Sequence, residues 1–331
     1  MAVTIRQVAK AAGVSVATVS YVLNGDPRIT AETRERVMAA VRELDYHPNS
    51  MARGLARNQT DIIGLLVPRP RYVSDPFLLE FISGVGDVVA DHNLGLLLLP
   101  ARGQEQEVPQ QVLRGGVDGV ILLESEPRDP RVEALRKRSI PFVLFGRCLD
   151  DTGIAWLDVD NVAGGRAAVE HLRALGHQRI GFISAPLKFM FAQYRRQGFL
   201  EGVGPSYDPT LEVEANLTQD GGYSAALKLL TRPDRPTAIV AASDLMALGA
   251  MQAAKELGLA VPDGLSIVGF DGTPVAAFAD PPLTTVRQPA YDIGARATRM
   301  LLGLLRGELA EPGGEIIQPS LVVRKSTGPL F

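Results

Sequence analysis

The sequence predicts a small, all-α helix-turn-helix unit followed by an α/β body of two doubly wound lobes with parallel sheets. Two observations carry this prediction. Between residues 4 and 23, apolar residues recur at helical spacing on both sides of a glycine, as in two short helices joined by a tight turn. Beyond residue 60, apolar runs of strand length alternate with helical patterns, which is typical of parallel sheets buried on both faces.

The first predicted helix begins at Thr4, whose side chain can cap the first turn while Gln7 completes a capping box. Gly13 permits a sharp turn, because glycine adopts positive φ at little cost. Ser15 is a suitable N-cap for the second helix and Thr30 for a third. The faces expected to pack together consist of Ile5, Val8, Ala9, Ala12, Val19, Val22, Leu23, Val37, Val41 and Leu44.

In a helix-turn-helix the second helix enters the major groove of DNA. Val16, Ala17 and Tyr21 lie on its unpacked face and are candidates for base contacts. The two small residues suit a thymine methyl group, and Tyr21 offers one hydrogen bond to a base or, alternatively, to a phosphate. Hydroxyl, amide and guanidinium groups suited to phosphate contacts come from Thr4, Ser15, Thr18, Ser20, Asn24, Thr33 and Arg34. Thr18 could equally be a packing residue.

Charge is distributed unevenly along the chain. The first 60 residues hold eight basic and five acidic residues, a net charge of +3, and the remainder holds 26 basic and 32 acidic residues, a net charge of −6. This asymmetry suits a nucleic-acid partner at one end only.

The body shows seven apolar runs of strand length, at 62–67, 94–99, 119–123, 141–145, 180–184, 238–242 and 265–270. Helical patterns separate them, at 78–92, 161–175, 193–203, 220–231 and 244–257. The alternation predicts βαβ units. Periodicity does not show where one lobe ends.

These residues resemble the LacI/GalR family of bacterial transcription regulators. The headpiece marks are T-I-x-x-V-A-x-x-A-G-V-S-x-x-T-V-S at 4–20, V-L-N at 22–24 and T-R-E-R-V at 33–37. In the body they include Asp158-Val159-Asp160-Asn161, Ser243-Asp244 and Val268-Gly269-Phe270-Asp271. The alternative for residues 1–57, an ordinary helical bundle, does not account for so many ordered matches.

The resemblance covers nearly the whole chain and implies a body like the type I periplasmic binding proteins. It divides the chain into a headpiece at 1–47, a hinge helix and linker at 48–60, and an effector-binding and dimerisation domain at 61–331. The N-lobe would comprise about 61–159 and 289–318, and the C-lobe about 160–288 and 319–331. The chain would pass between the lobes near 159–161, 285–289 and 318–321.

Residues 49–57 form a second candidate DNA element. Pro48 ends the third helix and Asn49 can cap a short new one, with Ala52 on its apolar face. By resemblance, Leu55 would wedge into the minor groove at the centre of the operator. A simple flexible linker is the alternative.

The resemblance also places an effector in the cleft between the lobes, at the carboxyl ends of the strands. Carried over position by position, the cleft set is Phe77, Arg147, Phe189, Phe191, Arg195, Tyr223, Ser243 and Asp271. Aromatic faces stack on sugar C–H groups, and the Arg and Asp side chains bind vicinal hydroxyls. Each phenylalanine could instead be a core residue.

Motifs of enzymes and metal sites are missing from the sequence: we find no G-x-S-x-G, H-E-x-x-H or P-loop pattern. Cys148 is the single cysteine, and His47, His92, His171 and His177 lack metal-ligand spacing. We therefore expect no metal, no cofactor, no membrane span and a cytoplasmic location.

The predicted function is a ligand-responsive regulator, a repressor acting as a homodimer on a palindromic operator, with a carbohydrate as effector. The alternatives are a solute-binding module without DNA function and a sugar-modifying enzyme on the same scaffold. Whether the ligand induces or corepresses, and which operator is bound, stay open. The chain has no leucine-heptad tail, which favours a dimer over a tetramer.

Overall fold

The computed structural model describes residues 3–23, 25–46, 59–67, 75–100, 108–309 and 313–330. The chain divides into two compact units, at Met1–Asp61 and Ile62–Phe331. Each unit contains one of the two architectures that the sequence predicts, so the predicted fold class is confirmed.

The first unit is a three-helix headpiece, with α1 at Ile5–Ala12, α2 at Val16–Leu23 and α3 at Ala31–Glu43. Gly13 has a φ of 64° and ends α1 in the left-handed conformation. The Thr18 N–H donates to Ser15 Oγ at 3.0 Å, and the Thr33 N–H donates to Thr30 Oγ1 at 3.3 Å. Both predicted caps are therefore present. The core of the headpiece consists of Val8, Ala9, Ala12, Val19, Val22, Val37 and Ala40.

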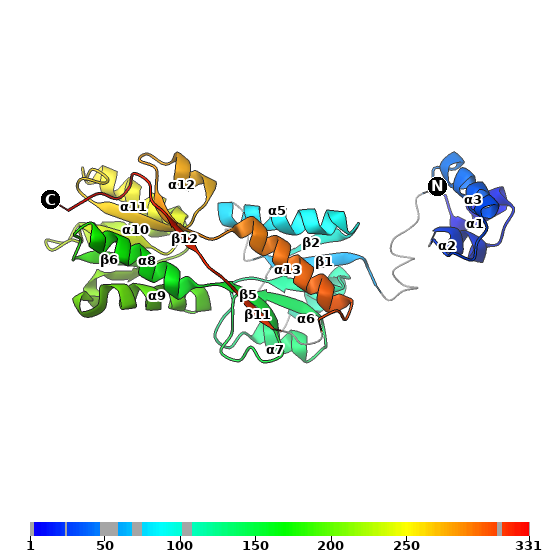
Figure 1. Ribbon diagram of the computed structural model, residues 1–331, viewed down its shortest axis with the longest axis horizontal. Coiled ribbons are helices and arrows are strands. Elements are labelled where there is room, and N and C mark those ends of the chain that lie inside the picture. The colour runs from blue at the N-terminus through cyan, green and yellow to red at the C-terminus, as the bar shows by residue number, and fades with distance from the viewer. Residues whose placement is uncertain are drawn as a thin grey trace. The chain divides into compact units, whose positions relative to one another are not determined.

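The second unit contains two six-stranded sheets (Figure 1). The first sheet is parallel throughout, in the order β11-β5-β4-β3-β1-β2. Its strands are β1 Ile62–Val67, β2 Gly95–Pro100, β3 Gly119–Leu122, β4 Phe142–Phe145, β5 Ala155–Val159 and β11 Gly314–Ile317. One face packs on α5 Pro76–Asp91 and α13 Ala290–Leu305, the other on α6 Val108–Gly115 and α7 Pro130–Arg136.

The second sheet has the order β12-β10-β9-β8-β6-β7 and is parallel except for the antiparallel pair of β10 and β12. Its strands are β6 Ile180–Ser184, β7 Glu212–Glu214, β8 Ala238–Ala241, β9 Ser266–Asp271, β10 Thr284–Arg287 and β12 Ser320–Val322. Helices α8 Asn161–Ala174 and α9 Met190–Val203 pair on one face, and α10 Gln219–Leu230 and α11 Asp244–Glu256 pair on the other. The short α12 Pro274–Phe278 follows β9, and 3₁₀ turns lie at Gly204–Ser206 and Pro209–Leu211.

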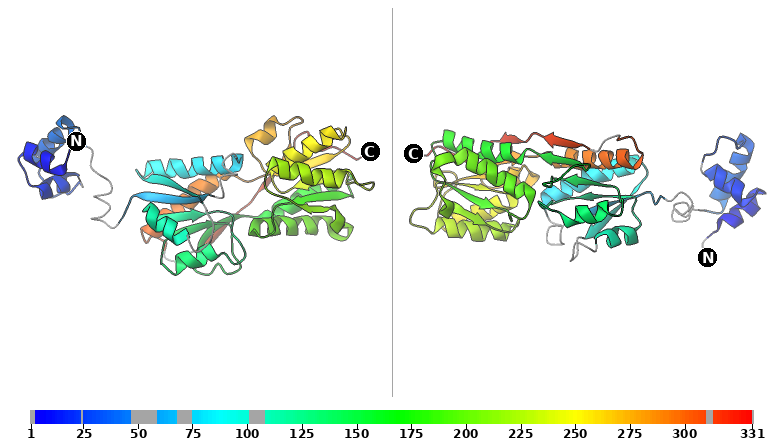
Figure 2. Two further views of the ribbon diagram at one scale, coloured as in Figure 1. Left: turned by 180° about the vertical axis from the view of Figure 1, so that it is seen from behind. Right: turned by 90° about the horizontal axis from the view of Figure 1, so that it is seen from below.

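Within the described ranges the chain changes sheets between β5 and α8, between β10 and α13, and between β11 and β12. The red C-terminal segment consequently runs along both lobes (Figures 1 and 2). Because the second lobe receives its edge strand β12 from the end of the chain, neither lobe is a continuous piece of sequence. Three connections between the lobes allow them to move about a common hinge.

Candidate functional site

The headpiece exposes the three residues predicted to contact bases. Val16 is 40 % exposed and Tyr21 is 47 % exposed, and Ala17 is exposed beside them, whereas Val19 and Val22 on the other side of α2 are buried. The Arg28 guanidinium lies 5.6 Å from the centre of the Tyr21 ring. Arg28 also pairs with Asp26, with its Nη2 2.7 Å from Asp26 Oδ2, so its charge beside α2 is already balanced within the headpiece.

Several residues predicted to contact phosphate already have partners within the headpiece. The Thr4 hydroxyl donates to Gln7 Oε1 at 3.0 Å, and the Ser15 and Thr18 hydroxyls lie 2.9 Å apart. The Thr33 hydroxyl accepts from Thr30 at 3.0 Å. A hydroxyl can still accept a further bond, so these contacts stay predictions, as does that of the half-buried Ser20.

Arg34 has a structural task that the sequence did not indicate. Its Nη2 donates to the Asp26 carbonyl at 2.9 Å and so ties α3 to the loop after α2. A phosphate contact would have to be made with its remaining N–H groups. Four other predicted DNA-contact residues lie outside the described residues: Asn24, Asn49, Ala52 and Leu55.

In the body, a cavity of about 80 Å³ lies between the two lobes. Polar groups at strand ends surround it, because the carboxyl ends of parallel strands meet at one edge of each sheet. The polar lining consists of Asp75, Glu124, Ser125, Asp158, Asn161, Arg195, Ser243, Asp271 and Gln288. The apolar lining is Phe77, Leu78, Leu123, Phe145, Phe191 and Leu217.

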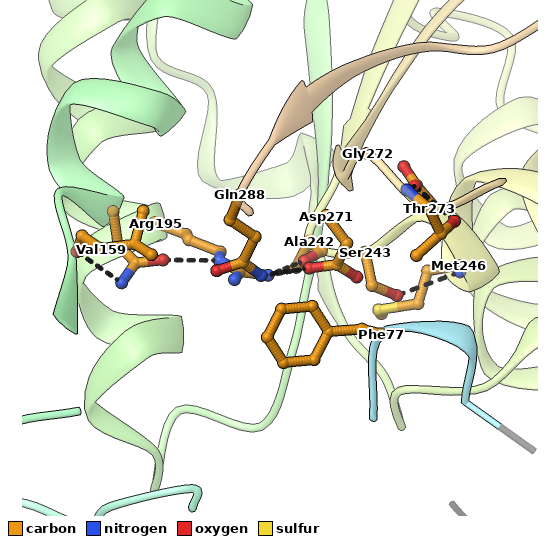
Figure 3. A network of polar contacts seen from close by, with 12 residues as sticks. Phe77, Val159, Arg195, Ala242, Ser243, Met246, Asp271, Gly272, Thr273 and Gln288 are labelled. Atoms are coloured by element: carbon orange, nitrogen blue, oxygen red, sulfur yellow. Dashed lines mark hydrogen bonds and ion pairs between the residues drawn. The ribbon is translucent and has the colours of Figure 1, made fainter. Parts of the chain in front are cut away.

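Arg195 is the centre of the polar network (Figure 3). Its Nε donates to Asn161 Oδ1 at 2.9 Å, and its Nη1 donates to the Ala242 carbonyl and lies 3.4 Å from Asp271 Oδ1. The Gln288 amide donates to the same Asp271 oxygen at 2.7 Å. The guanidinium also stacks on Phe270, 3.6 Å from the ring centre. These contacts fix the positions of the Arg195 and Asp271 side chains.

One pair of helices and one buried carboxylate position this network. Gly165 of α8 and Gly198 of α9 face each other's helix so closely that a Cβ atom on either would lie within 2.5 Å of backbone. The close approach brings Arg195 on α9 against Asn161, the first residue of α8. Beneath Asp271, the buried Asp244 carboxylate accepts from the Thr273 N–H at 2.7 Å and so holds the loop that follows β9.

Burial raises the pKa of several carboxyl groups around the cavity. It raises the pKa of Glu124 to about 7 and that of Asp271 well above its ordinary value, although Arg195 opposes the latter shift. The pKa of Asp75 is also raised by burial. Since one charged guanidinium stands among these acids, the cavity carries more negative than positive charge when its carboxyls are ionised.

Five of the eight predicted effector residues line the cavity, namely Phe77, Phe191, Arg195, Ser243 and Asp271. Ser243 also accepts from the Met246 N–H at 3.2 Å and so caps α11. The Phe77 ring faces the Asp271 and Gln288 pair from the other lobe (Figure 3).

Arg147 and Phe189 stand one layer behind the lining. Arg147 Nε donates to Asp158 Oδ2 at 3.0 Å, and its guanidinium lies 4.4 Å from the centre of the Tyr194 ring. Phe189 stacks on Phe191 with ring centres 5.7 Å apart. Both residues support side chains of the lining rather than facing the cavity themselves.

The structure does not bring Tyr223 to the cavity, which corrects the prediction for this residue. Tyr223 lies on α10, and its hydroxyl donates to Glu256 of α11 at 2.6 Å on the outer face of the lobe. The half-buried Tyr223 side chain packs against the core of the second lobe.

Sequence reasoning missed Asp75, Glu124, Asp158, Asn161 and Gln288 as lining residues. Each stands at or near an end of an element: Glu124 directly follows the apolar run 119–123, and Gln288 directly follows β10, which is not one of the apolar runs. A polar residue immediately after a buried parallel strand was the signal that could have found them.

The described residues hold no group of three or more His, Cys, Asp or Glu arranged to bind a metal ion. Within the same ranges, no helix has the length and apolar character needed to cross a membrane.

A helix-turn-helix unit joined to a two-lobed body with a polar interlobe cavity defines a ligand-responsive transcription regulator. Residues 4–49 match the model of bacterial regulatory proteins of the lacI family, and residues 169–327 match a periplasmic binding protein-like domain. The transcriptional regulator CelR of Thermobifida fusca is 36 % identical over 98 % of both chains. The repressor CytR of Escherichia coli strain K12 is 35 % identical over 99 % of this chain and 97 % of its own. The chain belongs to the LacI family.

Two solved structures extend these similarities. A complex of CelR with cellobiose has a TM-score of 0.76 at 35 % identity, covering 98 % of this chain and 99 % of that one. A lac repressor dimer bound to operator and the anti-inducer ONPF has a TM-score of 0.88 at 30 % identity, covering 99 % and 100 %. These relatives are regulators, which confirms the prediction that the chain is not an enzyme.

Proposed function

We propose that this protein is a repressor that binds a palindromic operator as a homodimer and changes its operator affinity when a sugar or sugar derivative enters the interlobe cavity. The observation that carries this proposal is the Arg195, Asp271 and Gln288 network facing Phe77 across the cavity. A fixed cation, a carboxylate and an amide bind vicinal hydroxyls, while an aromatic face covers the sugar ring. The cellobiose complex of the relative CelR supports this ligand class.

The operator would be read by α2. Its exposed Val16, Ala17 and Tyr21 form a face suited to the major groove, and the hinge segment with Asn49, Ala52 and Leu55 would add a minor-groove contact. Acting on chromosomal DNA implies a cytoplasmic location. The lac repressor dimer solved on its operator supports the same arrangement for this chain.

The dimer would form along the β2 edge of the first sheet. Helices α5 and α6 both pack against β2, and each of the three elements exposes a leucine: Leu79 is 50 %, Leu98 46 % and Leu113 63 % exposed. In the second lobe Phe278 of α12 is 87 % exposed. A second copy of this chain would cover these side chains. Apolar surface at an exposed sheet edge is usually covered in this way by a partner.

Coupling between the sites would follow from contacts that join the lobes. The Met190 N–H donates to the Ser125 carbonyl at 2.9 Å, and Arg147 of the first lobe stacks on Tyr194 of the second. A ligand that binds residues of both lobes favours one lobe angle over others, and so shifts the population that is competent for DNA.

The test is operator binding by fluorescence anisotropy at fixed salt, using palindromic sites from the DNA beside the protein's own gene and a panel of sugars. We expect sequence-dependent binding that one sugar weakens. Tyr21→Ala should lower operator affinity by about tenfold, and Asp271→Asn should weaken the response to that sugar. Glu133→Gln, at an exposed position of α7, is the matched control.

The absence of sequence-dependent binding under all conditions would overturn the proposal in favour of a solute-binding module. Binding that appears only with a ligand would replace induction by corepression.

A further inference from the structure

The charged groups around the interlobe cavity do not balance. Among the residues that the structure describes, Asp75, Glu124, Asp158 and Asp271 line the cavity together with a single cation, Arg195. Two of these acids have partners: Asp158 pairs with Arg147 at 3.0 Å, and Asp271 is held by Arg195 and Gln288. The remaining two, Asp75 and Glu124, form an acidic wall on the first lobe.

Cations near Glu124 are already engaged elsewhere. Arg131 donates to the carbonyl of Glu124 at 2.9 Å, but its ion pair, at 2.6 Å, is with Asp129. Lys188 pairs with Glu126 at 3.5 Å. Within the described part of the chain, the Glu124 carboxylate makes no hydrogen bond or ion pair.

Asp75 is similarly without a cation among the described residues. Its Oδ1 accepts the Phe77 N–H at 3.0 Å and so caps α5, which leaves its acceptor capacity toward the cavity largely unused. Its charge also helps to raise the pKa of Glu124, which places the two carboxyls near each other. An unpaired carboxylate at a desolvated site is costly and gains most from a cationic partner.

We propose that the effector carries a protonated amine that binds between Asp75 and Glu124, so that its chemical class is an amino sugar. The hydroxyl groups of the same molecule bind Arg195, Asp271 and Gln288 on the opposite lobe. This inference rests on the proposed role of the cavity as the effector site. An amino sugar therefore bridges the lobes, with its charge on one and its hydroxyls on the other.

The test is isothermal titration calorimetry of the full chain with two matched series. The first is glucose, glucosamine and N-acetylglucosamine, and the second is cellobiose, its diamino analogue chitobiose, and N,N′-diacetylchitobiose. In at least one series the amine should bind more tightly than both neutral counterparts by about tenfold or more, as expected for a charge-assisted pair. A result in which no amine exceeds its neutral counterparts overturns the proposal, whether or not any sugar binds.

Two variants and one control test whether Asp75 and Glu124 cause the preference for the amine. Glu124→Gln and Asp75→Asn keep the size of each side chain, and Asn still caps α5, so each should reduce the preference for the amine to about threefold or less. Glu133→Gln, on the same lobe but exposed, should retain it. A preference that survives both substitutions would place the amine elsewhere and refute the assignment.

Proton release gives an independent readout. Because burial raises the pKa of Glu124 to about 7, part of its population is protonated at pH 7, and a bound ammonium group drives it to the charged form. Amine binding to the wild-type protein should therefore release protons, measured in buffers of different ionisation enthalpy, and Glu124→Gln should release fewer. Operator binding by the wild-type protein is measured in parallel. If it persists while the amine preference is absent, only the ligand class is wrong and the regulator function stands.

Discussion

The contact between α8 and α9 makes Gly198→Ala a sharp test of how the fold positions Arg195. A Cβ atom at Gly198 would lie 2.1 Å from the Val162 carbonyl oxygen, whereas ordinary contact begins at 3.4 Å. The helices must therefore separate by about 1.3 Å to reach ordinary contact. The Arg195 Nε to Asn161 Oδ1 bond, now 2.9 Å, spans the same pair of helices and would lengthen to about 4.2 Å, beyond hydrogen-bonding range.

The expected cost combines three terms. Overpacking costs about 1–3 kcal/mol, a lost hydrogen bond to a charged group about 1.5–3 kcal/mol, and the better helix propensity of Ala returns about 1 kcal/mol. We expect Gly198→Ala to lower the free energy of unfolding by about 1.5–5 kcal/mol, measured by urea unfolding followed by far-UV circular dichroism.

Gly86→Ala is the matched control, because Gly86 also lies inside a helix but a Cβ atom there meets nothing within 4 Å. It should raise the free energy of unfolding by about 0.5–1 kcal/mol. If Gly198→Ala proved as stable as Gly86→Ala, the close helix contact would not be what positions Arg195.

Three further predictions concern other parts of the chain. Folding raises the pKa of Glu124 from 4.5 to about 7, so the folded state prefers the protonated carboxyl and stability falls as pH rises from 4.5 to 7. Urea unfolding at pH 5 and pH 8 should show that Glu124→Gln removes this loss of at most about 3 kcal/mol. Because the Tyr223 hydroxyl binds Glu256 outside the cavity, Tyr223→Phe should leave ligand affinity by calorimetry within about twofold, and a larger loss would return Tyr223 to the site. Thr30→Ala removes the cap of α3 and should destabilise the headpiece by about 1 kcal/mol in thermal unfolding; an unchanged headpiece would show that this cap does not stabilise α3.

Local patterns predicted the fold where burial is continuous. The seven apolar runs became β1–β4, β6, β8 and β9. All of these strands except the edge strand β2 are buried along most of their length, as a strand covered on both faces should be. The runs did not include β10, whose buried Thr284 and Thr285 read as polar. The Thr284 N–H donates to Ser326 Oγ at 2.8 Å, a partner 42 residues away that no local window contains.

The candidate site was also predicted only in part, because some of its features depend on contacts between distant parts of the chain. Arg195 and Asp271 were expected at the cavity from their places in the family pattern, and they lie there. Tyr223 was misplaced because its position depends on how α10 packs against α11. Glu124 was overlooked because a sequence does not show which acids have a cationic partner. The nearby Arg131, for example, pairs with Asp129, and this pairing appears only in three dimensions.

The position of Arg147 offers a way to follow movement of the lobes by tryptophan fluorescence. Its guanidinium lies 5.5 Å from the ring of Trp156 in the first lobe and 4.4 Å from that of Tyr194 in the second. Trp156 is the single tryptophan of the chain. A lobe rotation that moves Tyr194 away from Arg147 would free the guanidinium beside this one indole, so the tryptophan emission spectrum can report that movement without an attached dye.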